Sequence, residues 1–187
     1  MRFADDFVIE SERLLIFAVD IAEYEKLAID RSNPTLWVDR GFSNPYGHLV
    51  DEPGPLRHRI PRIAKDPSLV PFLLRMAVLK ATMEIVGSAG FHDGPDESGM
   101  IEIGLEIVGE HQGQGLAQEL VAAMWDWVVH DARVKTLRYT VSPENAPSQA
   151  IIKKFGFAHC GQQMDDEDGP EDIYEMSADD FRALRAL

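Results

Sequence analysis

A glycine-rich turn lies between two segments of different hydrophobic period and reads His111-Gln112-Gly113-Gln114-Gly115-Leu116-Ala117. Before it, residues 100–108 alternate apolar and polar side chains, the period of a half-buried strand. After it, apolar residues recur every three or four positions, which predicts a helix over residues 114–130. The first N–H groups of a helix have no helical partner, and the helix dipole is positive there. We therefore expect the turn to bind an anion, most naturally a phosphate or diphosphate.

The residues around the glycines narrow the kind of phosphate ligand. No Lys-Ser or Lys-Thr pair follows them, so the side chains that hold a terminal phosphate and its magnesium are missing. The dinucleotide fingerprint needs a small residue where Gln118 stands, and an acidic residue about twenty positions further on, after a second parallel strand. Neither requirement is met. A glycine pair before a helix is by itself a weak signal.

The longer pattern Gln112-x-x-Gly115-x-Ala117 is more specific, because it resembles the acetyl-coenzyme A loop of the GNAT acetyltransferases, Gln/Arg-x-x-Gly-x-Gly/Ala. Other segments are similar to the branch of that family that acetylates the N-termini of ribosomal proteins. These segments are Ser11-Glu12-Arg13-Leu14-Leu15, Val86-Gly87-Ser88-Ala89-Gly90-Phe91, Glu102-Ile103-Gly104-Leu105, Asn145-Ala146-Pro147-Ser148 and Phe155-Gly156-Phe157. The resemblance covers most of the chain except about residues 30–70.

This resemblance implies an α/β protein with the GNAT fold, formed by residues 1–187 as a single domain. Such a fold has a mixed central sheet of six to seven strands flanked by helices. Its two central parallel strands splay apart in a V that admits the pantetheine arm of acetyl-coenzyme A. Residues 31–71, rich in proline and without a sustained period, would form the acceptor side that sets substrate specificity.

The loop residues are expected to hold the diphosphate of the cofactor chiefly through main-chain N–H groups of residues 112–117. Gly113 and Gly115 would be present because side chains there would block the close approach of the ligand. For His111, beside the loop, we favour a positioning role over that of a base. Asn145 and Ser148, at the start of a predicted helix, are implied to meet the sulfur or the pantetheine amides.

The implied chemistry is direct transfer of acetyl from acetyl-coenzyme A to a primary amine in a ternary complex. An amine arrives protonated, so a general base is needed. Glu102 lies on the strand that should line the slot, and it matches a glutamate proposed to act through water in the ribosomal-protein branch. Glu106 shares its face through the two-residue period, and for it we favour a structural role. His92 and Tyr139 are reserve acid or base groups.

The thioester oxygen and the departing thiolate also need stabilisation. We expect the oxyanion donor in the backbone at Ile107 or Val108, where the strand ends. Many family members carry a thiolate-protonating tyrosine near the closing Gly-Phe, but Ile152 occupies that position here. Ser148 matches the serine of the ribosomal-protein branch and is the second catalytic candidate, with solvent as the alternative proton source.

Composition limits the other partners. The 187 residues carry a formal net charge of −14, which opposes binding to nucleic acid or anionic membranes. The charge would favour a cationic acceptor if it is concentrated near the site, and solubility alone is the alternative explanation. No apolar run approaches a membrane span, and the first residues lack the form of a signal peptide. The single cysteine, Cys160, suits a reducing cytoplasm and is predicted to be a small core residue. No paired metal-ligand spacing is present, so no metal is predicted.

The predicted function is an N-acetyltransferase of the acyltransferase class. Its acceptor would be a protein N-terminus or a small amine such as a polyamine, an amino acid or an aminoglycoside. A binding or sensory module that holds acyl-coenzyme A without turnover is the alternative. The missing tyrosine favours that alternative, while Glu102 and Ser148 oppose it. Exposed sheet edges favour a homodimer.

Periodicity, caps and turn residues predict the other elements. The predicted strands are residues 14–17, 72–80, 83–91, 136–141, 157–164 and 173–176, with an acidic turn over 165–172. The predicted helices are residues 21–29 capped by Asp20, a short piece over 61–65, a helix from Asn145 to Phe155 ended by Gly156, and a terminal helix from Ser177 through Leu187.

Overall fold

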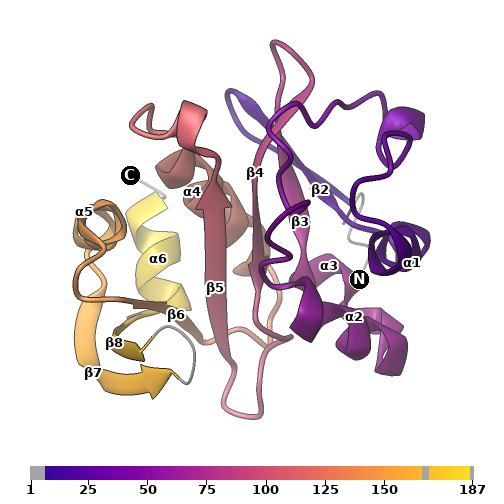
Figure 1. The fold of residues 1–187 in the computed structure, drawn as a ribbon. Coiled ribbons are helices and arrows are strands. Elements are labelled where there is room, and N and C mark those ends of the chain that lie inside the picture. The colour runs from indigo at the N-terminus through magenta and orange to yellow at the C-terminus, as the bar shows by residue number, and fades with distance from the viewer. Residues whose placement is uncertain (1–6, 166–168, 186–187) are drawn as a thin grey trace. The chain divides into compact units, whose positions relative to one another are not determined.

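The computed structural model describes residues 7–165 and 169–185 and forms one mixed sheet with the strand order β1-β2-β3-β4-β5-β6-β8-β7 (Figure 1). The strands are β1 Val8–Glu10, β2 Leu14–Ala18, β3 Arg75–Leu79, β4 Glu84–Phe91, β5 Met100–Ile107, β6 Thr136–Val141, β7 Ala158–Asp165 and β8 Gly169–Ser177. The helices are α1 Ile21–Ile29, α2 Leu56–Lys65, α3 Val70–Leu73, α4 Leu116–Val128, α5 Ala146–Phe155 and α6 Ala178–Arg185, with short 3-10 turns at Val38–Arg40, Pro67–Leu69 and Gly109–His111. The predicted α/β class with a mixed sheet is confirmed.

The chain forms two compact units, which are described one at a time. The first comprises Met1–Gly90 and Leu105–Met124, and the second comprises Phe91–Gly104 and Trp125–Leu187. Strands β4 and β5 and helix α4 contribute residues to both. The single GNAT domain over residues 1–187 stays a prediction.

In the first unit, strands β1 to β4 pair antiparallel in chain order, beside α1, α2 and α3 (Figure 1). Helix α1 begins as its sequence predicts, because Asp20 and Glu23 form a reciprocal capping box that satisfies two backbone N–H groups. Tyr24 and Leu27 of this helix are buried in a core cluster with Leu74 and Met76.

The segment of residues 31–71 is more ordered than its composition predicts. It contributes Trp37, Phe42 and Leu49 to the core, so these side chains stabilise the unit by apolar burial. Helix α2 begins at Leu56 and not at Pro61, because Pro61 is accommodated inside the helix.

Other boundaries also differ from the prediction. Phe72 and Leu73 belong to α3 and its end, so β3 begins only at Arg75. The sheet has eight strands where six to seven were expected, since the short strand Val8–Glu10 pairs with β2. Strand β8 starts at Gly169, and residues 166–168 of the predicted acidic turn lie outside the described residues.

In the second unit, β5 and β6 are parallel, as the intervening helix predicts, and β8 and β7 follow in antiparallel pairing. The β5–β6 ladder ends at the pair Ile103–Tyr139, although both strands continue beyond it. This early end of the ladder is the pattern that diverging strands produce. Cys160, predicted to be buried, is exposed, because one face of β7 is open to solvent.

Candidate functional site

The predicted diphosphate loop lies in the first unit, where β5 leads through a 3-10 turn into α4. Gly113 and Gly115 adopt left-handed backbone conformations with φ of 72° and 77°, which explains why glycine stands at both positions. The first helical hydrogen bond runs from the N–H of Glu119 to the carbonyl of Gly115 at 3.1 Å. The N–H groups of Leu116 and Ala117 precede that bond, so they have no helical acceptor and suit an anionic ligand.

Two glutamine side chains brace the loop from within. The Gln112 amide donates to the carbonyl of Ile107 at 2.8 Å and so ties the turn to the end of β5. The Gln114 amide donates to the carbonyl of Glu110 at 3.2 Å. These side chains fix the loop, which leaves the main chain as its anion-binding part. The binding of a diphosphate by Gln112 to Ala117 stays a prediction, which the main chain of the loop would have to fulfil.

The backbone at the end of β5 narrows the choice of oxyanion donor. The N–H of Val108 donates to the carbonyl of Val86 at 3.0 Å, and the carbonyl of Val108 accepts from His111 at 2.9 Å. The N–H of Val108 is thus committed to Val86, and the oxyanion role of the Ile107 backbone stays a prediction.

His111 and Tyr46 connect the loop to the acceptor segment. The His111 Nε2 lies 2.9 Å from the Tyr46 hydroxyl, and the two rings meet edge to face with centroids 5.1 Å apart. Within the described residues, the buried Nδ1 of His111 has no hydrogen-bond partner. Partial removal from water raises the pKa of Tyr46, and the Glu84 and Glu110 carboxylates raise it further. The structure thus supports the positioning role predicted for His111.

Two carboxylates of the first unit, Glu106 and Glu52, are close enough to influence each other. The pKa of Glu106 is raised because its carboxyl group is partly removed from water and because Glu52 is close. Glu52 belongs to the predicted acceptor segment, so this segment and the end of β5 together present negative charge. A protonated amine would be attracted to it.

His48 anchors the acceptor segment to β4. Its Nε2 lies 2.9 Å from the Ser88 hydroxyl, and Asn44 binds both the N–H and the carbonyl of His48 through its side chain. His48 and Ser88 are both buried. Burial lowers the pKa of His48 to about 4 from its ordinary value of 6.5.

This shift predicts acid sensitivity. Between pH 6.5 and about 4 the unfolded chain binds a proton that the folded chain does not, so the stability that neutral His48 contributes is complete above pH 6.5 and falls as the pH decreases. The loss should reach about 3 kcal/mol near pH 4. Urea unfolding of the wild type and of His48→Gln at pH 7 and pH 5 checks this. An equally steep decline in the variant would assign the acid sensitivity to other groups.

The candidate base, Glu102, lies in the second unit on β5. The Thr140 hydroxyl donates to Glu102 Oε1, and His92 Nδ1 lies 3.6 Å from the same oxygen. The Glu102 side chain is 14% exposed and that of His92 is 51% exposed. Gly104 gives the His92 ring room, because a Cβ there would lie 3.2 Å from His92 Nε2. The hydroxyl that donates to the carboxylate and the nearby imidazole orient Glu102, whose role as a base stays a prediction.

Ser148 forms a second cluster in this unit, with Asn145 and Tyr139. Asn145 caps α5 by accepting the N–H of Ser148 at 3.1 Å. The Tyr139 hydroxyl donates to the Ser148 hydroxyl at 3.4 Å. Burial raises the pKa of Tyr139, so its phenol keeps its proton. Ile152, at the position usual for the family's tyrosine, is buried.

The two clusters belong to opposite faces of the β5–β6 pair. Glu102 pairs with Arg138, and Thr140 shares that face by the two-residue period. Tyr139 lies between Arg138 and Thr140 along β6, so its side chain points to the other face, where it contacts Ser148. The structure therefore joins Glu102 with Thr140 and Ser148 with Tyr139, but not the two candidates with each other. Thr140 was missed, although its alternation with Tyr139 was a signal that could have identified it.

Residues 7–165 and 169–185 contain no group of three or more histidine, cysteine, aspartate or glutamate side chains that could hold a metal ion. Across the same ranges, no helix has both the length and the apolar character that crossing a bilayer requires.

Sequence comparison identifies the class of protein to which this loop and sheet belong. The family described as Acetyltransferase (GNAT) domain matches residues 13–158. The chain therefore belongs to the GNAT acetyltransferase family, which uses acetyl-coenzyme A as its acyl donor. This finding confirms the predicted family.

Individual relatives match only part of the chain. The chain is similar to the "Uncharacterized N-acetyltransferase p20" of Bacillus licheniformis, with 31% identity over 90 residues, which are 48% of this chain and 51% of the relative. The match thus spans about half the length of that relative.

Solved structures share the fold at low identity. The ribosomal-protein-S5-alanine acetyltransferase of Vibrio fischeri has a TM-score of 0.64 and 15% identity, over 93% of this chain and 98% of that one. A spermidine N-acetyltransferase SpeG chimera from Vibrio cholerae and hSSAT has a TM-score of 0.63 and 13% identity, over 91% of this chain and 99% of that one. At these identities the likeness establishes the fold alone.

Proposed function

We propose that this chain is an acetyl-coenzyme A-dependent N-acetyltransferase that transfers acetyl directly to a primary amine in a ternary complex. The observation that carries the proposal is the turn from Gln112 to Ala117. Its left-handed glycines and helix-start N–H groups lie within the stretch that matches the GNAT family. Bound there by its diphosphate, coenzyme A would supply the activated acetyl thioester.

Glu102 is the proposed general base. Thr140 orients its carboxylate through a hydrogen bond to Oε1, and a proton taken from the incoming ammonium group, directly or through water, would be held on the carboxylate. The backbone at Ile107 is the proposed donor toward the developing charge on the thioester oxygen.

The hydroxyl pair is the proposed proton source for the departing thiolate, in place of the tyrosine that Ile152 replaces. If so, Ser148→Ala and Tyr139→Phe should each lower kcat by about 100-fold, the lower end of the range for a positioned acid. Tyr174→Phe is the matched control, because Tyr174 pairs in register with Tyr139 and donates to Gln149 at 2.7 Å. Steady-state rates that equal those of the control in both variants would assign protonation to solvent.

The proposed acceptor is a protein N-terminus or a small cationic amine. The fold shared with a ribosomal-protein acetyltransferase supports the first, and the negative charge of Glu52 and Glu106 supports an acceptor that carries a positive charge. An acyl-coenzyme A sensor without turnover is the second candidate, favoured by Ile152 in place of the usual tyrosine.

Thiol release from acetyl-coenzyme A tests the function directly. The purified chain is incubated with acetyl-coenzyme A and a panel of N-terminal peptides, polyamines, amino acids and aminoglycosides, with a reaction lacking amine as the background. The expected result is thiol release above background with one acceptor class. Tight binding of acetyl-coenzyme A without release from any amine would identify a sensor.

A further inference from the structure

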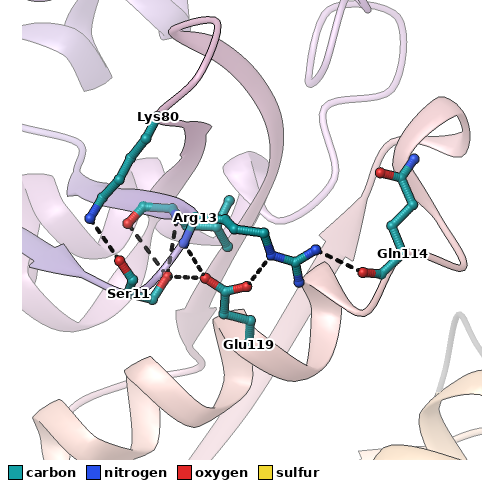
Figure 2. A network of polar contacts seen from close by, with 6 residues as sticks. Ser11, Arg13, Lys80, Gln114 and Glu119 are labelled. Atoms are coloured by element: carbon teal, nitrogen blue, oxygen red, sulfur yellow. Dashed lines mark hydrogen bonds and ion pairs between the residues drawn. The ribbon is translucent and has the colours of Figure 1, made fainter.

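Arg13, in the bend between β1 and β2, contacts the loop proposed to bind coenzyme A (Figure 2). Its Nη1 donates to the carbonyl of Gln114 at 2.9 Å, and its Nε donates to Glu119 Oε2 at 2.6 Å. The N–H of Arg13 and the Ser11 hydroxyl donate to the other carboxylate oxygen of Glu119 at 2.6 and 2.7 Å. Lys80 in turn donates to the carbonyl of Ser11 at 2.7 Å. All of these residues belong to the first unit.

Glu119 poses an electrostatic problem for an anion site. It lies in the first turn of α4, so its negative charge is close to the N–H groups that a diphosphate would use. Burial alone would raise the pKa of Glu119, but hydrogen bonds from the Arg13 backbone, the Ser11 hydroxyl and the Arg13 guanidinium lower it below its usual range. The carboxylate is therefore ionised at neutral pH, and Arg13 is the cation that offsets it.

Arg13 also retains hydrogen-bonding capacity on the loop side. Its side chain is 42% exposed, and within the described residues its Nη2 makes no hydrogen bond. This nitrogen lies beside the loop, because a Cβ at Gly115 would be 3.6 Å from it. A guanidinium with free N–H groups next to helix-start amides has the geometry to bind a phosphate oxygen.

We infer that Arg13 is a binding residue for the diphosphate of coenzyme A and that its guanidinium offsets the nearby negative charge of Glu119. This inference rests on the proposed function, since it assigns a further residue to the same loop. Arg13 holds the loop through the Gln114 carbonyl and donates to the diphosphate through Nη2, and its charge prevents Glu119 from repelling the ligand.

Two variants that break the Arg13–Glu119 ion pair show whether Arg13 binds coenzyme A or only stabilises the loop. Arg13→Gln removes the cation and exposes the Glu119 charge, so coenzyme A should bind about 10- to 100-fold more weakly by calorimetry, as expected for the loss of a charge-assisted hydrogen bond. Glu119→Gln removes the competing negative charge and leaves Arg13 in place. It should bind coenzyme A as tightly as the wild type or up to about fivefold more tightly.

The decisive result is the difference in coenzyme A affinity between the two variants. If both variants lose affinity equally, the ion pair only braces the loop and the inference is wrong. It is also wrong if Arg13→Gln binds like the wild type, or if its loss disappears with 3′-dephospho-coenzyme A, which would place Arg13 at the ribose phosphate. Wild-type protein that fails to bind coenzyme A would instead overturn the proposed function itself.

Arg185→Gln is the matched control. Arg185 forms a similar ion pair with Asp126 at 2.6 Å and is 49% exposed, but it lies in the second unit. Coenzyme A affinity should be unchanged in this variant. Thermal unfolding of all three variants verifies that they are folded before binding is compared.

Discussion

Glu102→Gln should lower kcat by about 10²- to 10⁴-fold, the range for a positioned general base, while the KM for acetyl-coenzyme A changes by less than about twofold. Glutamine keeps the size of the side chain and can still accept the hydrogen bond from Thr140, but it cannot take up the proton of the amine. The loss should therefore fall on turnover and not on donor binding. Steady-state kinetics with the acceptor identified by the amine panel measures both parameters.

The pH–rate profile tests the role of Glu102 as the base more directly than kcat alone. Loss of the base should remove the acidic limb of the wild-type profile, whereas an unchanged profile in Glu102→Gln would eliminate Glu102 as the base. Glu175→Gln is the matched control, because Glu175 is a partly buried carboxylate of the same unit that pairs with Arg138 at 2.6 Å. Its kcat should stay close to that of the wild type.

The second large effect is expected at Gly115. Gly115→Val should weaken the binding of coenzyme A at least about 100-fold, because a side chain there would displace the diphosphate from one or two of its charge-assisted hydrogen bonds. Without ligand the added Cβ would meet only Arg13 Nη2, at 3.6 Å, which is an ordinary contact. The main intramolecular cost is therefore the left-handed backbone at φ 77°.

Gly41→Val provides the matched comparison. Gly41 has a φ of 75° and no atom within 4 Å of an added Cβ, so the backbone strain is similar but no part of coenzyme A is expected there. Both variants should lose similar amounts of unfolding free energy in urea, and only Gly115→Val should lose coenzyme A affinity. Equal affinity in the two variants would move the diphosphate away from this loop.

Features that depend on a few neighbouring residues could be predicted from the sequence. The Asp20 cap of α1, the left-handed Gly156 that ends α5 and the alternation along β5 all match the structure. Each rests on backbone hydrogen bonds or side-chain periods that span four residues or fewer. The glycine turn before α4 was predictable for the same reason.

Local rules failed where packing overrode them. Pro61 predicted a helix start, yet α2 runs through it, and Cys160 predicted burial, yet its strand is exposed. The strand Val8–Glu10 is too short to give a period, and it exists because β2 offers it a partner.

The sequence by itself determined the family, and it identified the glycine turn, Glu102 and Ser148 as candidates. Only the tertiary structure decided their partners: Thr140 for Glu102 and Tyr139 for Ser148. It also placed Arg13 on Glu119, more than a hundred residues away along the chain. Such partnerships depend on strand register and on how distant segments pack, and no local period or cap encodes either.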